Sequence, residues 1–211
     1  MTGHDRDLIA YYSAEFETGR RSELSDFRHG LRESFLDMIG GETLAGPLLD
    51  VGAGPGLDTV EFARAGIEAI GLDLTPVHAA AIARRGLPAM TASAVDLPLA
   101  TASVGAVWSM STLMHLPADL ANLAIGELVR VAAPGGPIAL GTWGLGTWDG
   151  DDSEALADGP AGLPRYFRWS SDSTWLAMLE RHATVEHFEA HVVDDSGEAY
   201  QFAVLRSGGG V

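Results

Sequence analysis

Three glycines at alternate positions follow a short apolar segment in the stretch LLDVGAGPGLD, residues 48–58. Glycine lets the backbone approach a ligand closely or adopt a positive φ, and here Gly52, Gly54 and Gly56 provide three such positions. A helix that begins near Leu57 would direct its free N–H groups and the positive end of its dipole at the same loop. The stretch therefore predicts a ligand-binding loop directly after a buried strand.

The acid beside this loop indicates what kind of ligand it takes. The dinucleotide fingerprint G-x-G-x-x-G/A needs glycine or alanine where this chain has Leu57. Asp50 precedes the loop, and a carboxylate there disfavours a pyrophosphate and suits an ammonium or sulfonium group. An NAD-dependent oxidoreductase is therefore the weaker hypothesis.

Two further acids follow later predicted strands. Asp73 lies in GLDLT, where a carboxylate accepts hydrogen bonds from both hydroxyls of an unphosphorylated ribose. Asp96 lies in SAVDLPLA, where it could meet an adenine amino group. Because parallel strands end at the same edge of a sheet, the three acids in this order predict a nucleoside site.

Strand and helix patterns alternate from residue 48 to residue 142. This alternation predicts parallel strands with helical crossovers, which form an open α/β sheet. The predicted strands are 48–51, 67–72, 88–92, 104–109 and 138–142, and the predicted helices are 57–65, 76–85 and 120–131.

The flanking segments follow other patterns. Helical spacing of apolar residues predicts two N-terminal helices, over 5–18 and 22–39. Residues 143–169 predict a long loop or lid, and 171–182 a further helix. TVEHFEAHVV and EAYQFAVLR alternate like two antiparallel strands. We expect one domain over 1–211, with N-terminal cap helices (1–44), a cofactor-binding half (45–142) and a closing part (143–211).

Five segments, taken in order, resemble the motifs of a known family: LLDVGAGPG, GLDLT, SAVDLPL, SVGAVWSMSTLMHLP and ELVRVAAPGGPIALGTW. They are similar to class I S-adenosylmethionine-dependent methyltransferases, in particular to the small-molecule branch that includes ubiquinone/menaquinone-type enzymes. The resemblance covers roughly residues 45–205. It implies a Rossmann-like, seven-stranded sheet, mostly parallel with an antiparallel C-terminal hairpin and with helices on both faces. Gly105 departs from the family, which usually has an aspartate there.

The resemblance also implies the cofactor S-adenosyl-L-methionine, with S-adenosyl-L-homocysteine as product, and a set of residues that contact it. The glycine loop with Ala53 would line the methionine part, near Asp50. Asp73 and Leu74 would hold the ribose and adenine, and the segment 95–97 would frame the adenine edge. The implied set is Asp50, Gly52, Ala53, Gly54, Gly56, Asp73, Leu74, Val95, Asp96, Leu97, Ser109 and Met110.

Methyl transfer requires a nucleophile about 3 Å from the methyl carbon and in line with the sulfur. The protein positions the nucleophile, excludes water and, for some acceptors, removes a proton. His115 is the candidate general base, with a structural or substrate-orienting role as the alternative. Tyr12 lies on the apolar face of the first helix and is expected in the core. Tyr11 points off that face and is the second catalytic candidate.

Other polar and aromatic residues have simpler interpretations. Arg28 and Arg32 share a helix face and are expected to be solvated, with anchoring of a carboxylate as the alternative. His187 and His191 share a strand face without an evident third ligand, so no metal site is predicted. The aromatic residues after the fifth strand either cover an acceptor pocket or form a small satellite core: Trp143, Trp148, Tyr166, Phe167 and Trp169.

Composition limits the classes of partner. The formal net charge is −16, which disfavours nucleic acid, because phosphate binding needs a basic face. There is no cysteine, no apolar run of the ~18 residues that a membrane span needs, and no apolar signal core at the N-terminus. We expect a cytoplasmic protein that is a monomer or homodimer, and the resemblance implies that it methylates a small-molecule acceptor. The alternatives are a cofactor-binding protein without transferase activity and an enzyme of cyclisation or rearrangement.

Overall fold

The computed structural model describes residues 3–19, 23–147, 151–192 and 198–208. Its centre is a seven-stranded sheet with the order β3-β2-β1-β4-β5-β9-β8. The first five strands in this order run parallel, and β9 pairs antiparallel with both β5 and β8. The predicted fold, a mostly parallel sheet with an antiparallel C-terminal hairpin, is confirmed. The strands are β1 (Leu48–Val51), β2 (Ala69–Asp73), β3 (Ala89–Thr91), β4 (Ala106–Met110), β5 (Pro137–Gly144), β8 (Thr184–Val192) and β9 (Ala199–Arg206).

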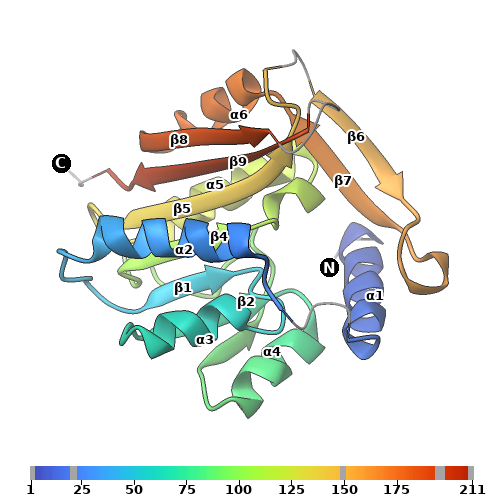
Figure 1. Ribbon diagram of the computed structural model, residues 1–211, viewed down its shortest axis with the longest axis horizontal. Coiled ribbons are helices and arrows are strands. Elements are labelled where there is room, and N and C mark those ends of the chain that lie inside the picture. Colours follow the sequence, from blue (N-terminus) through green and yellow to red (C-terminus); the bar gives the residue numbers. More distant parts are fainter. Residues whose placement is uncertain (1–2, 20–22, 148–150, 193–197, 209–211) are drawn as a thin grey trace.

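The central strands are buried on both faces, which explains why they are short continuous apolar runs. Leu49 belongs to a core between the sheet and helices α5 (Ala118–Val131) and α6 (Asp172–Leu179). Leu48 points to the opposite face and packs under α2 (Asp26–Ile39) and α3 (Leu57–Arg64). Figure 1 shows α2 and α3 in front of the sheet and α5 behind it.

The segment between β5 and α6 is more ordered than the predicted loop. It contains β6 (Asp151–Leu156) and β7 (Arg165–Ser170), which pair antiparallel as a separate two-stranded sheet, with the short 3₁₀ helix η2 (Pro160–Gly162) between them. The prediction of a structureless lid is wrong because the acidic sequence of β6 shows no apolar alternation of its own. Pairing with β7 decides its conformation.

The first helix, α1 (Gly3–Glu17), contacts α4 (Pro76–Arg84), β7 and η2. Figure 1 shows it beside the β6–β7 hairpin, away from the central sheet. The helix therefore packs against two different parts of the chain. No helix among the described residues combines the length and apolar character that a membrane span requires.

Candidate functional site

A cavity of about 240 Å³ lies where β1, β2 and β4 end. The β1–α3 loop, the β2–α4 loop and the segment after β4 form one wall, and α1 and the start of α2 form the other. This is the place where strand order reverses in an open α/β sheet. The residues of the predicted site that line it are Gly52, Ala53, Gly54, Asp73, Leu74, Met110 and His115.

The glycines of the loop have different surroundings. Gly52 has φ +69°, and a Cβ there would lie 2.0 Å from Oγ1 and 2.8 Å from Cβ of Thr112. Gly54 has φ +55°, and a Cβ there would meet nothing within 4 Å. A Cβ on Gly56 would lie 2.4 Å from Cγ1 of Ile82, and this glycine is outside the cavity lining. Gly52 and Gly56 therefore allow close packing of the protein, whereas Gly54 leaves open space at the cavity.

The carboxylate of Asp73 is held by main-chain donors. Its Oδ2 accepts a hydrogen bond from the N–H of Gly54 at 2.8 Å, and its Oδ1 accepts one from the N–H of Thr75 at 2.7 Å. Nδ1 of His78 lies 3.2 Å from the same Oδ1. Because an ionised carboxylate offers about four acceptor positions, Asp73 retains capacity for the two hydroxyls of a ribose.

Asp50 does not line the cavity but is buried behind the loop. Its Oδ2 accepts a hydrogen bond from Oγ1 of Thr59 at 2.6 Å. Burial, and next the nearby Asp58 carboxylate, raise the pKa of Asp50 from 3.8 to about 7, against the opposing effects of Thr59 and Arg28. The expected contact of Asp50 with a cofactor ammonium is replaced at the cavity wall by Asp58, the second residue of α3.

Asp58 joins two arginines that were expected in solvent. Nε of Arg28 donates to its Oδ2 at 2.9 Å, and Nη1 of Arg32 donates to its Oδ1 at 2.7 Å. Nε1 of Trp108 donates to the same Oδ2 at 3.1 Å. Burial lowers the pKa of Arg28, but Tyr200 and Asp58 outweigh that effect and the net shift is upward. The prediction of solvated arginines is wrong, because a buried acid on α3 faces α2.

Arg28 is the member of this group that reaches the cavity. Its Nη1 donates to the hydroxyl of Tyr200 at 3.2 Å, which fixes the orientation of the guanidinium. An arginine has five N–H donors in a planar fork, the geometry that carboxylates match. Arg28 is therefore suited to hold the carboxylate of an amino acid.

The segment 95–97, which was expected beside the adenine, does not line the cavity. Asp96 is exposed, the Leu97 side chain is in the core, and the segment 95–97 is outside the cavity lining. The backbone of Leu97 is tied to α5, since its N–H donates to Glu127 and its carbonyl accepts from Arg130. Ala92, Ser93 and Ala94, directly after β3, line the cavity instead. A contact of Val95, Asp96 and Leu97 with adenine stays a prediction.

The end of β4 contributes backbone as well as side chains. Ser109 is buried and its Oγ donates to the carbonyl of Val51 at 3.0 Å, so it ties two strands together and does not face the cavity. Met110 lines the cavity as expected, followed by Ser111 and Thr112. Ser111 has φ +53°, a conformation that costs energy in a residue other than glycine. Its Oγ lies 3.1 Å from the hydroxyl of Tyr200.

His115 ends the short 3₁₀ helix η1 (Leu113–His115) and is buried at the cavity wall. Its Nδ1 lies 2.9 Å from the carbonyl oxygen of Tyr166. Its Nε2 lies 2.5 Å from the hydroxyl of Tyr12, which also lines the cavity. The backbone carbonyl of His115 lies 2.5 Å from Nε2 of His4. The N-terminal helix and the lid strand β7 are thus both bonded to this histidine.

The positions of the two tyrosines of α1 are the reverse of the prediction. Tyr11 is 1 % exposed and absent from the cavity lining. Its ring lies under the Arg165 guanidinium, 5.0 Å from ring centroid to Cζ, and burial raises its pKa. Tyr12 was expected in the core and instead reaches His115. The reason is that α1 contacts β7 and η2 as well as α4, so that it buries residues on more than one side.

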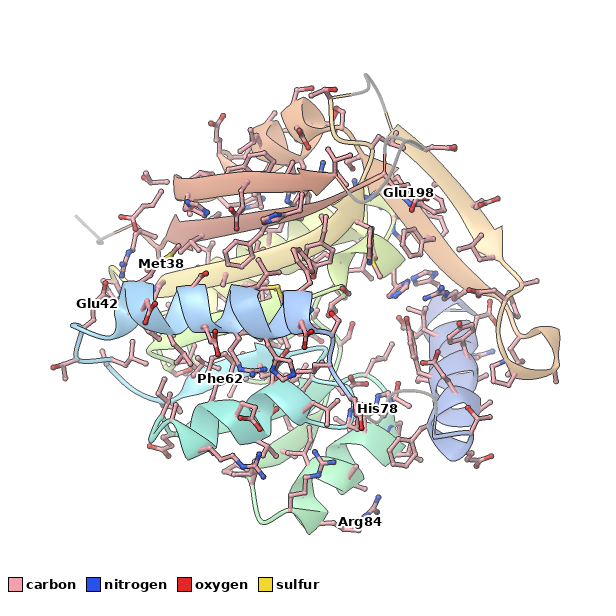
Figure 2. The ribbon with its side chains drawn as sticks, viewed as in Figure 1. Met38, Glu42, Phe62, His78, Arg84 and Glu198 are labelled. Carbon is pink, nitrogen blue, oxygen red and sulfur yellow. The ribbon has the colours of Figure 1, made fainter. Side chains whose placement is uncertain are left out.

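His78 is a cavity residue that the sequence analysis missed. It lies on α4, and Figure 2 shows it on the side of α4 that faces α1. Its ring contacts the rings of Tyr12 and Phe16, with centroids 6.3 and 5.5 Å apart. Its position five residues after Asp73, in the first turn of a helix, is the signal that was available in the sequence.

Other predicted features lie away from the cavity. Glu189 lies between His187 and His191, at 3.7 and 2.9 Å, and the described residues contain no group of three or more potential ligands placed to hold a metal ion. The lid aromatics pack on one another and on His115, with ring centroids 4.2 Å apart for Phe167–Trp169 and 5.5 Å for His115–Phe167. Trp148 lies outside the described residues.

Comparison with known proteins finds a similarity to one family in the central part of the chain. Residues 49–140 match the family described as "Methyltransferase domain". The match covers less than half of the chain. It includes the glycine loop, Asp73 and the segment from Met110 to His115.

Two uncharacterized methyltransferases of mycobacteria are similar in sequence. The protein from Mycobacterium ulcerans (strain Agy99) is 41% identical over 118 residues, which cover 53% of this chain and 46% of that protein. The protein from Mycobacterium sp. (strain JLS) is 39% identical over 116 residues, which cover 54% and 44%. The matched region thus spans about half the length of these relatives.

Solved structures extend the likeness in fold to the whole chain. The 1,6-didemethyltoxoflavin-N1-methyltransferase of Burkholderia thailandensis, crystallised with its substrate and S-adenosylhomocysteine, has a TM-score of 0.73 and 18% identity, with coverage of 99% of this chain and 92% of that one. The geranyl diphosphate C-methyltransferase of Streptomyces coelicolor A3(2) has a TM-score of 0.74 and 14% identity, with coverage of 98% and 99%. The chain has the Rossmann-like methyltransferase fold.

Proposed function

We propose that this protein transfers a methyl group from S-adenosyl-L-methionine to a small organic acceptor. The observation that carries the proposal is the pairing of Gly54 with Asp73 at the cavity. The N–H of Gly54 fixes the Asp73 carboxylate at 2.8 Å, and the missing side chain of Gly54 leaves the space in front of it open. A nucleoside needs both features at the ends of β1 and β2.

The residues present fit the parts of this cofactor. Asp73 and Leu74 suit the ribose and adenine, with Ala92–Ala94 along the base. Arg28 suits the carboxylate and Asp58 the ammonium of the methionine part, since both line the cavity. The bound cofactor supplies a methyl group already activated by a positively charged sulfur. The protein then has to place the acceptor, exclude water and manage a proton.

The cavity wall opposite the sheet is consistent with a small acceptor. Helix α1 contributes Leu8 and Tyr12 to the wall opposite the sheet, and the segment before α2 contributes Leu24, around a volume of about 240 Å³. A cavity closed in this way by one helix suits a compact molecule. The proposal includes the finer points that the sequence suggested: one domain over residues 1–211, a relationship to the ubiquinone/menaquinone-type branch, and His115 as part of the proton path.

Calorimetry with S-adenosylhomocysteine, S-adenosylmethionine and NAD tests the cofactor assignment. The proposal expects saturable binding of the first two and none of NAD. A screen of small acceptors, followed by mass shift and by release of S-adenosylhomocysteine, then tests transfer. Binding without release of that product in any screen would favour the cofactor-binding or rearrangement alternatives, and absence of binding would refute the proposal.

A further inference from the structure

The hydrogen bonds of His115 determine its tautomer. The carbonyl oxygen of Tyr166, 2.9 Å from Nδ1, can only accept, so Nδ1 carries the hydrogen. In a neutral imidazole Nε2 is then an acceptor, and the hydroxyl of Tyr12 donates to it at 2.5 Å. Both ring nitrogens thus face protein groups, and the oxygen of Tyr12 stands between Nε2 and any acceptor that contacts the phenol.

The guanidinium of Arg165 lies beside Tyr12. Burial lowers the pKa of Arg165, but hydrogen bonds to Asp158 and Tyr12 outweigh it, and the net shift is upward. Arg165 also pairs with Asp158 at 2.7 Å, which holds the guanidinium in place. The other titratable groups around the tyrosine and His115 are His78 on α4, Tyr11, Asp5 and His4 on α1, and Tyr166 on β7.

We propose that Tyr12 is a catalytic residue that removes the proton from a hydroxyl acceptor, and that His115 acts through it as the positioning and proton-accepting partner. This inference rests on the proposed methyl transfer. It replaces His115 with Tyr12 as the group in contact with the acceptor, and it names the acceptor class as phenols or alcohols.

The proton and the electrons balance in one step. The acceptor oxygen forms a bond to the methyl carbon while the bond from that carbon to sulfur breaks, and sulfur keeps the electron pair. The acceptor proton passes to the oxygen of Tyr12, and the phenol proton of Tyr12 passes to Nε2 of His115. The resulting imidazolium keeps its Nδ1–H on the carbonyl of Tyr166, and later loses the extra proton to solvent.

A base in this position favours acceptors whose nucleophilic atom is an oxygen over those whose nucleophilic atom is a nitrogen. A neutral hydroxyl is a poor nucleophile until its proton is removed during the reaction. A neutral amine already presents a lone pair and needs no base before attack. An enzyme for amines would gain nothing in the methyl-transfer step from a buried tyrosine bonded to a histidine.

The test uses the full chain with phenols of graded acidity, from p-nitrophenol to p-methoxyphenol, and with aniline and benzylamine as nitrogen acceptors. Tyr12→Phe is compared with Tyr11→Phe, which removes one hydroxyl from the neighbouring residue outside the cavity. S-adenosylhomocysteine affinity is measured first for each protein. We expect affinities within threefold of one another, which separates this test from a failure of the cofactor assignment.

We expect Tyr12→Phe to lower kcat for p-methoxyphenol by at least a hundredfold, within the ~10²–10⁴ range of general-base catalysis. The loss shrinks toward p-nitrophenol, which is the most acidic acceptor of the series and needs a base least, and Tyr11→Phe loses far less with every acceptor. Equal losses in the two variants, a loss independent of acceptor acidity, or methylation of the amines alone would overturn the proposal. If cofactor binds and no phenol is methylated, the proposal also fails.

A second readout does not depend on turnover. Nitrogen NMR of His115 is expected to show hydrogen on Nδ1, with the Nε2 signal moved by Tyr12→Phe and unmoved by Tyr11→Phe. His115→Gln places an amide where Nε2 was, and His115→Asn places one where Nδ1 was. We expect greater retention of kcat in His115→Gln. An Nε2 signal that is the same in wild type and Tyr12→Phe would show that no such bond forms.

Discussion

The two walls of the cavity are built differently. On the sheet side the polar groups are held by main chain, as where Gly54 and Thr75 donate to Asp73. On the helix side the polar groups are held by side chains from distant parts of the sequence. Tyr12 bonds His115 across 103 residues, and Arg28 bonds Asp58 across 30.

This difference separates a wall that is formed locally from one that depends on docking. A strand, a tight glycine loop and a helix fix the sheet wall as soon as β1 and β2 pair. The helix wall exists only when α1 and α2 are docked. If these helices move, the hydrogen-bonded pairs Tyr12–His115 and Arg28–Asp58 lose their geometry. We therefore expect substitutions in the sheet wall to act mainly on stability and cofactor affinity. Those in the helix wall should act on the acceptor, on the methionine part of the cofactor or on one docked helix.

The largest effect is expected from Gly52→Ala. The new Cβ would lie 2.0 Å from Oγ1 and 2.8 Å from Cβ of Thr112, so rotation of that side chain does not relieve the clash. With the cost of a positive φ added, we expect a loss of about 3 kcal/mol or more in the free energy of unfolding. Urea denaturation measures it.

Gly54→Ala is the matched control, with a similar φ and no neighbour within 4 Å of the new Cβ. We expect a loss of about 1 kcal/mol from backbone strain alone, together with at least tenfold weaker binding of S-adenosylhomocysteine. Equal destabilisation by the two substitutions would show that the loop is not held as described.

The arginine pair tests the helix wall. Arg32→Met removes a buried donor from Asp58, and we expect it to lower the free energy of unfolding by about 2 kcal/mol with little change in cofactor affinity. Arg28→Met removes the donor that reaches the cavity, and we expect about tenfold weaker binding of S-adenosylhomocysteine. Melting curves and calorimetry on both variants distinguish the roles, and an affinity loss confined to Arg32→Met would reverse the assignment.

Asp73 and Asp96 form another pair, because the sequence assigned both to the nucleoside and the structure brings only one to the cavity. We expect Asp73→Ala to weaken S-adenosylhomocysteine binding at least tenfold, or about 1.4 kcal/mol. Asp96→Ala, at an exposed position, should leave the affinity within twofold. Calorimetry measures both affinities. A tenfold loss of affinity in Asp96→Ala would support the predicted contact of Asp96 with adenine.

The smallest effect concerns pH. Burial raises the pKa of Asp50 from 3.8 to about 7, so between these values the folded state binds a proton that the unfolded state has lost. Stability therefore falls as pH rises through this range and is constant above it.

Asp50→Asn keeps an oxygen for Thr59 and cannot ionise. We expect it to match wild type near pH 4 and to exceed it by at least about 1 kcal/mol near pH 8. Unfolding curves at several pH values measure the difference. A difference that does not change with pH would contradict the burial of an ionisable carboxyl at this position.

The sequence predicted the sheet wall because its signals are local. Glycine spacing, Asp73 after an apolar run and the alternation of elements each depend on a few neighbouring residues. The same reasoning predicted that Asp50 and Ser109 contact the ligand, but neither residue lines the cavity. A sequence motif does not show which side of a strand faces the cavity. It also missed Asp58, whose partners lie on another helix.

The amino-acid order by itself determined the strands, the turn geometry at Gly52 and Gly54, and the acid at the end of β2 that lines the cavity. Tertiary structure alone decided which tyrosine of α1 reaches His115 and which arginine reaches the cavity. The physical reason is that periodicity describes a helix with one buried face, whereas α1 is packed on one side by α4 and on the other by β7 and η2. A helix between two partners buries residues on more than one side, and only its docking shows which residues are left for the ligand.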